Sequence, residues 1–115
     1  MRAFPALLLA LAATPALAAD GKALFDGKCA ECHTVGAAST DAAPTLKGVV
    51  GRKIASLTDF QYSDALKAKG GVWTDANLET WLTQPSAFAP GTKMFISVPS
   101  AADRATLIGY LKTAK

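Results

Sequence analysis

The chain has 115 residues, and its 12 Lys and Arg residues against 9 Asp and Glu residues give a formal net charge of +3. This length suits one domain and excludes a two-domain enzyme with a cleft between its lobes. The chain is mildly basic but lacks the basic run that grips nucleic-acid phosphates. We therefore expect no nucleic-acid partner.

The first residues have the pattern of a secretory signal peptide. Arg2 supplies a positive charge, an apolar run fills residues 6–13, and residues 16–18 match the small-x-small cleavage rule. The apolar run is too short to span a bilayer, which needs about 20 apolar residues. We therefore predict a signal peptide over residues 1–18 and no permanent membrane anchor.

Cleavage after Ala18 or Ala19 leaves a single exported, periplasmic domain over residues 19–115. A domain of this size buries only part of its surface and is marginally stable by itself. Small exported domains often add disulfides, but this one has only Cys29 and Cys32, and a bridge between them would close too short a loop to stabilise much. The sequence thus indicates that a prosthetic group completes the core.

The first two helical patterns are short. One helix is predicted over residues 21–28, and a second over residues 63–69, which begins at Ser63 or Asp64 and ends before Gly70-Gly71. No segment shows the sustained alternation of apolar and polar residues that a strand requires.

Two further helices have clearer signals. Thr74 caps a helix that runs to about Gln84, where Pro85 stops it. The buried stripe of that helix should be Leu78, Trp81 and Leu82. The last helix begins at Ser100, which forms a capping-box-like pattern with Asp103. Its buried side chains should be Leu107, Tyr110, Leu111 and Ala114.

The segments between these helices, residues 34–59 and 86–99, have no periodic pattern. Structureless loops of this length are uncommon in compact domains unless they are functional. We therefore predict an all-α fold of about four helices, in which long loops wrap a ligand that replaces the missing core.

The chemistry is concentrated in Cys29-Ala30-Glu31-Cys32-His33, which is the C-x-x-C-H attachment signature of c-type haem. Two intervening residues on a helical turn match the spacing of the two vinyl groups on one porphyrin edge, so each thiol can form a thioether. His33, the only histidine, then presents its imidazole to iron as the proximal ligand. The motif predicts one haem c, bound covalently through Cys29 and Cys32.

Three other uses of these residues agree less well with the sequence. A thioredoxin-like redox pair follows a strand in a βαβ frame, and no strand is predicted before Cys29. A zinc site would have only three soft ligands, and the adjacent Cys32 and His33 suit a tetrahedral site poorly. A structural disulfide would again close only a short loop.

Further segments accompany the haem motif over the whole mature chain, beginning with Gly21 and Phe25. The later ones are Ala43-Pro44-Thr45-Leu46, Gly51-Arg52-Lys53, Phe60-x-Tyr62-x-Asp64, Trp73, Pro90-Gly91-Thr92-Lys93-Met94 and Leu107-Ile108-Gly109-Tyr110-Leu111. In this set and order, the chain resembles the class I cytochromes c, which include mitochondrial cytochrome c and bacterial cytochrome c2. The resemblance implies a small cytochrome c fold around one haem, with the last helix crossing the first near Gly21.

The resemblance also implies roles for individual residues. Met94, the only methionine of the mature chain, is implied to be the distal iron ligand, and the Pro44 carbonyl is implied to orient the His33 imidazole. The implied partners of the buried haem propionate are Arg52, Tyr62 and Trp73, with Thr92 as a further propionate or water contact. A cavity between His33 and Met94 should be lined by Leu46, Tyr62, Trp73, Leu82 and Phe95.

Ala43 replaces the family's usual glycine, which affects the geometry of the loop at Pro44. Three further positions depart from the family's pattern. Trp81 stands in the place of a tyrosine beside the methionine ligand, and Leu66 replaces an asparagine nearby. Ile96 stands where an aromatic residue usually covers the haem edge, with Phe95 one place earlier. We expect these changes to affect potential and stability without changing the function.

The sequence thus predicts a soluble, exported, monomeric electron carrier that cycles one iron between Fe(II) and Fe(III), and not an enzyme. The alternative is a haem enzyme or gas sensor with a labile distal ligand, although His33 is already used and no second histidine can act as a distal acid or base. A carrier dedicated to one periplasmic dehydrogenase would have the same sequence features.

The expected partners are redox proteins with acidic faces, namely a cytochrome c reductase, a terminal oxidase, a dehydrogenase or a photosynthetic reaction centre. They should meet lysines near the exposed haem edge. These lysines are Lys28, Lys47, Lys53, Lys67, Lys69 and Lys93.

Overall fold

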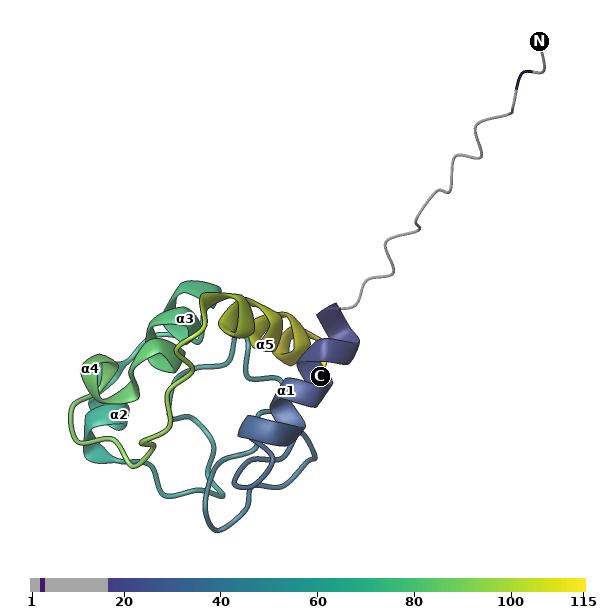
Figure 1. The fold of residues 1–115 in the computed structure, drawn as a ribbon. Helices are drawn as coiled ribbons and strands as arrows, with labels where there is room; N and C mark the ends of the chain where they lie inside the picture. The colour runs from purple at the N-terminus through teal and green to yellow at the C-terminus, as the bar shows by residue number, and fades with distance from the viewer. Residues whose placement is uncertain (1–2, 4–16) are drawn as a thin grey trace.

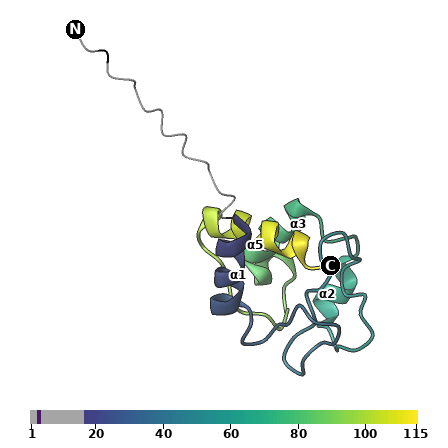
Figure 2. The same ribbon diagram turned by 90° about the vertical axis from the view of Figure 1, so that its right-hand side faces the viewer.

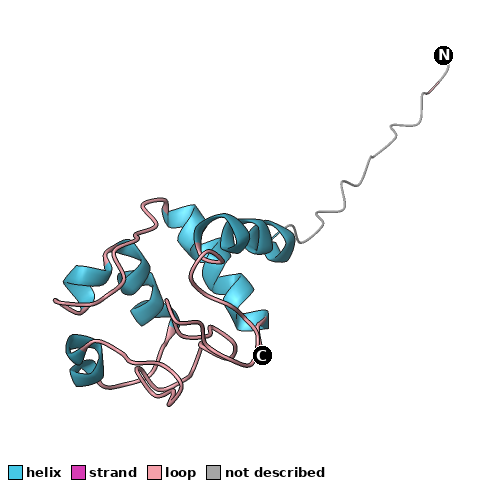
Figure 3. Ribbon diagram, turned by 90° about the horizontal axis from the view of Figure 1, so that it is seen from below, coloured by secondary structure: helices cyan, strands magenta, loops and turns pink. Residues whose placement is uncertain are grey.

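The computed structural model describes residue 3 and residues 17–115, and the predicted signal peptide therefore lies outside the described residues except at residues 3, 17 and 18. The described part of the chain is all-helical, and its only strand-like pairing is an isolated bridge between Lys53 and Val72 (Figure 3). Its helices are α1 (Leu17–Lys28), α2 (Asp64–Lys69), α3 (Asp75–Thr83), α4 (Pro85–Phe88) and α5 (Ala101–Thr113).

Helix α5 packs against both α1 and α3, and α4 packs against α3 (Figures 1 and 2). The α1–α5 crossing lies at Gly21, as the family resemblance implied. A Cβ atom added to Gly21 would lie 2.5 Å from Tyr110 Cβ and 3.0 Å from the Thr106 carbonyl oxygen. Only glycine allows the two backbones to approach this closely.

Replacing Gly21 with alanine should therefore lower the free energy of unfolding by about 1–3 kcal/mol, the usual cost of overpacking. The matched control is Gly27→Ala in the same helix, where an added Cβ atom meets nothing within 4 Å. That control should raise the stability of the protein by up to about 1 kcal/mol, because alanine is the better helix former. Thermal unfolding of both variants checks the prediction, and equal effects would contradict the close crossing.

The predicted helix starts are confirmed by side-chain caps. Ser63 Oγ accepts a hydrogen bond from the Leu66 N–H at 3.2 Å, and Thr74 Oγ1 accepts one from the Asn77 N–H at 3.1 Å. Ser100 Oγ accepts one from the Asp103 N–H at 3.2 Å. Each cap satisfies an N–H group that the helix itself leaves without a partner.

Three predictions about the helices need correction. Pro85 ends α3 but also begins α4, because proline suits the first turn of a helix, where its missing N–H costs nothing. Tyr110 and Ala114 are only half-buried, whereas Ile108, which was not predicted to be buried, is buried. The described residues therefore form five helices rather than four, the additional one being a single turn.

The long loops are held by specific hydrogen bonds despite their lack of periodicity. Residues 51–54 run beside residues 71–73: the Trp73 N–H donates to the Arg52 carbonyl and the Gly51 N–H to the Trp73 carbonyl, both at 2.8 Å. Gly48 N–H donates to the Ala114 carbonyl at 2.5 Å, which ties the loop to the residue that follows α5. These bonds hold the loops around the centre of the domain.

Candidate functional site

A cavity of about 290 Å³ lies between the helices and the long loops. The five residues predicted to line it, Leu46, Tyr62, Trp73, Leu82 and Phe95, all do so. Every predicted site residue also lies on its wall. These residues are Cys29, Cys32, His33, Pro44, Arg52, Tyr62, Trp73, Thr92 and Met94.

The two cysteines and His33 lie on a turn that continues α1. The Cys29 N–H donates to the Phe25 carbonyl at 2.8 Å, and the His33 N–H donates to the Cys29 carbonyl at 2.8 Å. Both bonds have the i→i−4 spacing of an α-helix, so the motif has the helical turn that the sequence predicted. Because a helix and not a strand precedes Cys29, a thioredoxin-like arrangement is absent from the described part of the chain.

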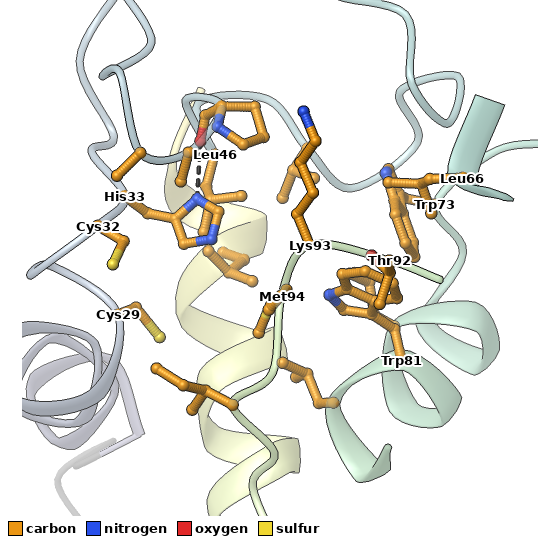
Figure 4. A pocket seen from close by; sticks show the side chains of 18 of the residues that line it. Cys29, Cys32, His33, Leu46, Leu66, Trp73, Trp81, Thr92, Lys93 and Met94 are labelled. Atoms are coloured by element: carbon orange, nitrogen blue, oxygen red, sulfur yellow. Dashed lines mark hydrogen bonds between the residues drawn. The ribbon is translucent and has the colours of Figure 1, made fainter. Parts of the chain in front are cut away.

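Both thiols are half-buried and unbridged. Figure 4 shows Cys29, Cys32 and His33 together on one side of the cavity. Burial raises the pKa of the Cys29 thiol, with a smaller opposing effect from the Lys28 charge. The thiol is therefore protonated at neutral pH.

The His33 imidazole is held in one tautomer. Its Nδ1 lies 2.7 Å from the Pro44 carbonyl oxygen, which can only accept, so Nδ1 carries the proton and donates. Burial lowers the pKa of His33, with the Pro44 hydrogen bond opposing and the Arg52 charge adding to the effect. The ring is therefore neutral, and its other nitrogen, Nε2, has a lone pair available to a metal.

Two polar side chains reach the wall from the loops. Arg52 Nη1 donates to the Lys47 carbonyl at 3.1 Å, and Nη2 donates to the Thr45 carbonyl at 3.0 Å. The Tyr62 hydroxyl accepts from the Leu57 N–H at 3.3 Å, which leaves its own proton for another acceptor. Burial lowers the pKa of Arg52 and raises that of Tyr62, so both groups remain protonated at neutral pH.

Trp73 and Trp81 form another part of the wall, and both pack against Phe88. Trp73 stacks on Phe88 with ring centroids 5.6 Å apart, and Trp81 meets Trp73 edge-on at 5.5 Å. Trp81 also meets Phe88 edge-on at 5.9 Å. The short helix α4 therefore supports the site, since it supplies the phenylalanine on which the two tryptophans pack.

The segment after α4 brings Met94 to the cavity, where it lies between Cys29 and His33 on one side and Trp81 and Thr92 on the other (Figure 4). Thr92 is buried and Met94 is half-buried. Phe95 and Ile96 both touch the cavity, but their side chains are 88% and 50% exposed. Neither residue closes the cavity mouth.

Lys93 lies beside this segment and reaches across to another loop. Its Nζ donates to the Gln61 carbonyl at 2.8 Å and lies 5.9 Å from the centre of the Phe60 ring. The lysine therefore fastens the Met94 segment to residues 60–61, which belong to the opposite loop.

This donor set fits haem c. One wall carries two thiols and a neutral imidazole, another wall carries a thioether, and apolar side chains enclose most of the space between them. The guanidinium of Arg52 and the hydroxyl proton of Tyr62 are available to a buried carboxylate, which must be paired.

The sequence did not point to a second group of polar residues near His33. Ser39 and Asp59, twenty positions apart, are joined by two hydrogen bonds of 2.8 and 2.7 Å. Ser39 also accepts from the N–H of Thr45, the residue after Pro44, at 2.9 Å. Serine and aspartate are ordinary loop residues, so no pattern in the sequence distinguishes these two.

Comparison with known proteins agrees with the geometry. The cytochrome c family profile matches residues 18–115. Cytochrome c from Theileria annulata is 48% identical over 98 residues, which are 84% of each chain. A cytochrome c-type cyt cy from Rhodobacter capsulatus is 43% identical over 94 residues, which are 81% of this chain and 47% of that protein.

A solved structure shows the same fold. Cytochrome cH from Methylobacterium extorquens superposes with a TM-score of 0.77 at 40% identity, over 84% of this chain and 97% of that one. The chain therefore belongs to the cytochrome c family, as an electron-transfer protein, not an enzyme, that carries haem c covalently on Cys29 and Cys32.

Proposed function

We propose that this electron carrier is an exported, monomeric shuttle in which His33 and Met94 would hold the haem iron as its two protein ligands. One observation carries the proposal: the neutral Nε2 of His33 and the only methionine of the mature chain line the same apolar cavity. When bound, haem supplies an iron that gains and loses one electron. Because His33 and Met94 would both bind the iron, the protein would leave no position on it for oxygen or peroxide.

The two ligands have complementary effects. The thioether of Met94 favours Fe(II), which raises the reduction potential. The Pro44 carbonyl holds the proton of His33 Nδ1 and so keeps Nε2 free and basic. The apolar wall excludes water, so fewer solvent molecules must reorganise when the charge on the iron changes.

We assign the remaining polar wall residues to the haem propionate. Arg52 contributes a positive charge and Tyr62 a hydroxyl proton, and the Trp73 indole N–H and the Thr92 hydroxyl are further possible donors. The support for this assignment is that all four side chains line the cavity within the loops. A buried carboxylate needs such donors to remain ionised.

We further propose that residues 1–18 direct export to the periplasm and are removed after Ala18 or Ala19. Among the described residues, no helix is long and apolar enough to cross a membrane. Fractionation of expressing bacteria, followed by N-terminal sequencing of the mature protein, tests this proposal. An intact Met1 terminus on the haem-loaded protein would contradict it.

The proposed partners are redox proteins with acidic docking faces, of the reductase, oxidase, dehydrogenase or reaction-centre classes. Six lysines that could meet such a face are exposed: Lys28, Lys47, Lys53, Lys67, Lys69 and Lys93. Three of them are partly engaged: Lys67 lies 3.9 Å from Asp64, Lys69 lies 4.3 Å from the centre of the Phe88 ring, and Lys93 donates to the Gln61 carbonyl. Stopped-flow oxidation and reduction against purified candidate complexes would identify the donor and the acceptor.

Electron transfer to such a partner should slow as salt rises, because attraction between exposed charges is screened beyond about 8 Å at physiological ionic strength. The rate should fall only gradually with salt concentration, since the formal net charge of +3 falls to +2 once Arg2 is removed with the signal peptide. Stopped-flow rates across a series of salt concentrations measure the slope.

Removing single positive charges from α1 tests where the docking face lies. Lys28→Gln removes a lysine at the cavity wall and should reduce both the rate and its salt dependence. The control, Lys22→Gln, removes the same charge from a residue that pairs with Asp26 and does not line the cavity. Equal effects of the two variants, or a rate that ignores salt, would contradict a charged docking face at the cavity mouth.

A further inference from the structure

A continuous chain of hydrogen bonds joins the His33 imidazole to the carboxylate of Asp59. His33 Nδ1 donates to the Pro44 carbonyl oxygen at 2.7 Å. The N–H of the same peptide unit belongs to Thr45 and donates to Ser39 Oγ at 2.9 Å. The Ser39 hydroxyl donates to Asp59 Oδ1 at 2.7 Å. We refer to these groups together as the Asp59 relay.

All donors in the relay point the same way, from the imidazole toward the carboxylate. Hydrogen bonds that share a direction polarise and strengthen one another. The peptide between Pro44 and Thr45 transmits this effect, because its C–N bond has partial double-bond character. When the N–H is drawn toward Ser39, the carbonyl oxygen becomes more negative and holds the proton of His33 Nδ1 more strongly.

The peptide in the middle of the relay is firmly held. Thr45 is 4% exposed. Its hydroxyl donates to the Gly36 carbonyl at 2.5 Å, and its carbonyl accepts from Arg52 Nη2 at 3.0 Å. These bonds hold Thr45, which supplies the N–H of the relay peptide, so losing the bond to Ser39 should change the polarisation of that peptide more than its orientation.

Asp59 is charged at neutral pH. Its two hydrogen bonds from Ser39, the one from the backbone N–H being the larger influence, hold the pKa of the carboxyl below its usual value, and the Arg52 charge adds to this. Asp59 also interacts electrostatically with Tyr62, and Asp41 and Lys93 line the same polar pocket. The relay therefore ends on a negative charge at neutral pH.

We propose that Ser39 and Asp59 are positioning residues for His33, which act through the Pro44–Thr45 peptide to make the imidazole a stronger electron donor and so lower the reduction potential of the haem. The direction follows because a more basic imidazole stabilises Fe(III) relative to Fe(II). This inference rests on the proposed ligation of iron by His33. It adds two residues outside the cavity wall that influence this ligand without contacting the iron.

The decisive variant is Ser39→Ala in the full-length, haem-loaded protein. It removes the hydroxyl but leaves the Asp59 charge in place. We expect the reduction potential to rise and the His33 Nδ1 proton, followed by NMR in the reduced protein, to exchange up to about twofold faster, because cooperative polarisation changes a neighbouring hydrogen bond of about 1 kcal/mol by about 10–30%. Ser39→Thr keeps a hydroxyl and should restore both values.

A second pair of variants distinguishes an effect transmitted through the hydrogen bonds of the relay from a purely electrostatic effect through space. Asp59→Asn and Asp41→Asn each remove one negative charge from the same polar pocket. Only Asp59 is bonded to Ser39, so Asp59→Asn should raise the potential more than Asp41→Asn does. Equal shifts from the two variants would mean that charge acts through space, and the relay would be wrong.

One further outcome would overturn the relay alone, and another would overturn the proposed iron ligation. If Ser39→Ala lowers the melting temperature but changes neither the potential nor the proton exchange, Ser39 and Asp59 only fasten the loops together, and the proposal fails. If the reduced wild-type protein shows no ring-current-shifted resonances from the His33 imidazole, the proposed ligation itself is wrong, and this is seen before any variant is made.

Discussion

Replacing both Cys29 and Cys32 with serine should leave little folded protein after export. The two thioethers hold the haem in a cavity of about 290 Å³ around which the long loops are arranged. Without the covalent group, buried residues such as Leu82 and Trp73 would face an unfilled space, and their dispersion contacts would be lost. Recovery of soluble protein and its circular dichroism on heating measure the effect.

The size of the chain explains why this effect should be large. Domains of about 100 residues are stable by only about 5–15 kcal/mol, and the binding free energy of a group that fits only the folded state is added to that stability. The matched control is Ala30→Ser, which adds a serine within the same motif at an exposed position and keeps both thiols. A haem-free double variant that still melts cooperatively would refute the claim that haem is part of the core.

The sequence predicted the helices well because their signals are local. Ser63, Thr74 and Ser100 each cap the helix they were predicted to cap, since a side-chain cap depends on residues only three positions away. Likewise Leu78, Trp81 and Leu82 are buried as their helical spacing predicted. The all-helical class follows from these local patterns.

The loop contacts could not be predicted in the same way. Ser39 meets Asp59 and Lys93 meets the Gln61 carbonyl across separations of 20 and 32 residues, and these pairings are fixed only when the loops fold around the cavity. Ile108 is buried beside Leu107, because α5 packs against α1 on one side and α3 on another. A single helical stripe cannot indicate two contact surfaces.

The family resemblance supplied what local patterns could not. It implied the Pro44 carbonyl as the partner of His33, and the structure has the two atoms 2.7 Å apart. It gave no reason to consider Ser39 or Asp59, since neither belongs to a segment that carries the resemblance. The contribution of residues outside those segments is therefore visible only once the loops are folded.

Replacing Met94 with alanine should lower the reduction potential by a substantial part of the roughly 0.8 V range that axial ligands set across haem proteins. The variant loses a soft thioether that favours Fe(II). Water should take the vacated position rather than Lys93, whose Nζ is already held by the Gln61 carbonyl and lies near the Phe60 ring. Carbon monoxide should then bind promptly to the reduced variant, whereas the reduced wild-type protein should bind it poorly.

The absorption spectrum of the oxidised protein tests the loss of the Met94 ligand more directly. The oxidised wild-type protein should show the weak far-red charge-transfer absorption of an iron–thioether bond, and Met94→Ala should lack it. The matched control is Phe95→Ala, which truncates the adjacent side chain; because Phe95 is 88% exposed, that variant should keep the band and its resistance to carbon monoxide. If Met94→Ala retained the band and its potential, the sixth ligand would be another residue. If the wild-type protein bound carbon monoxide at once, the distal position would be labile, as in a haem enzyme or gas sensor.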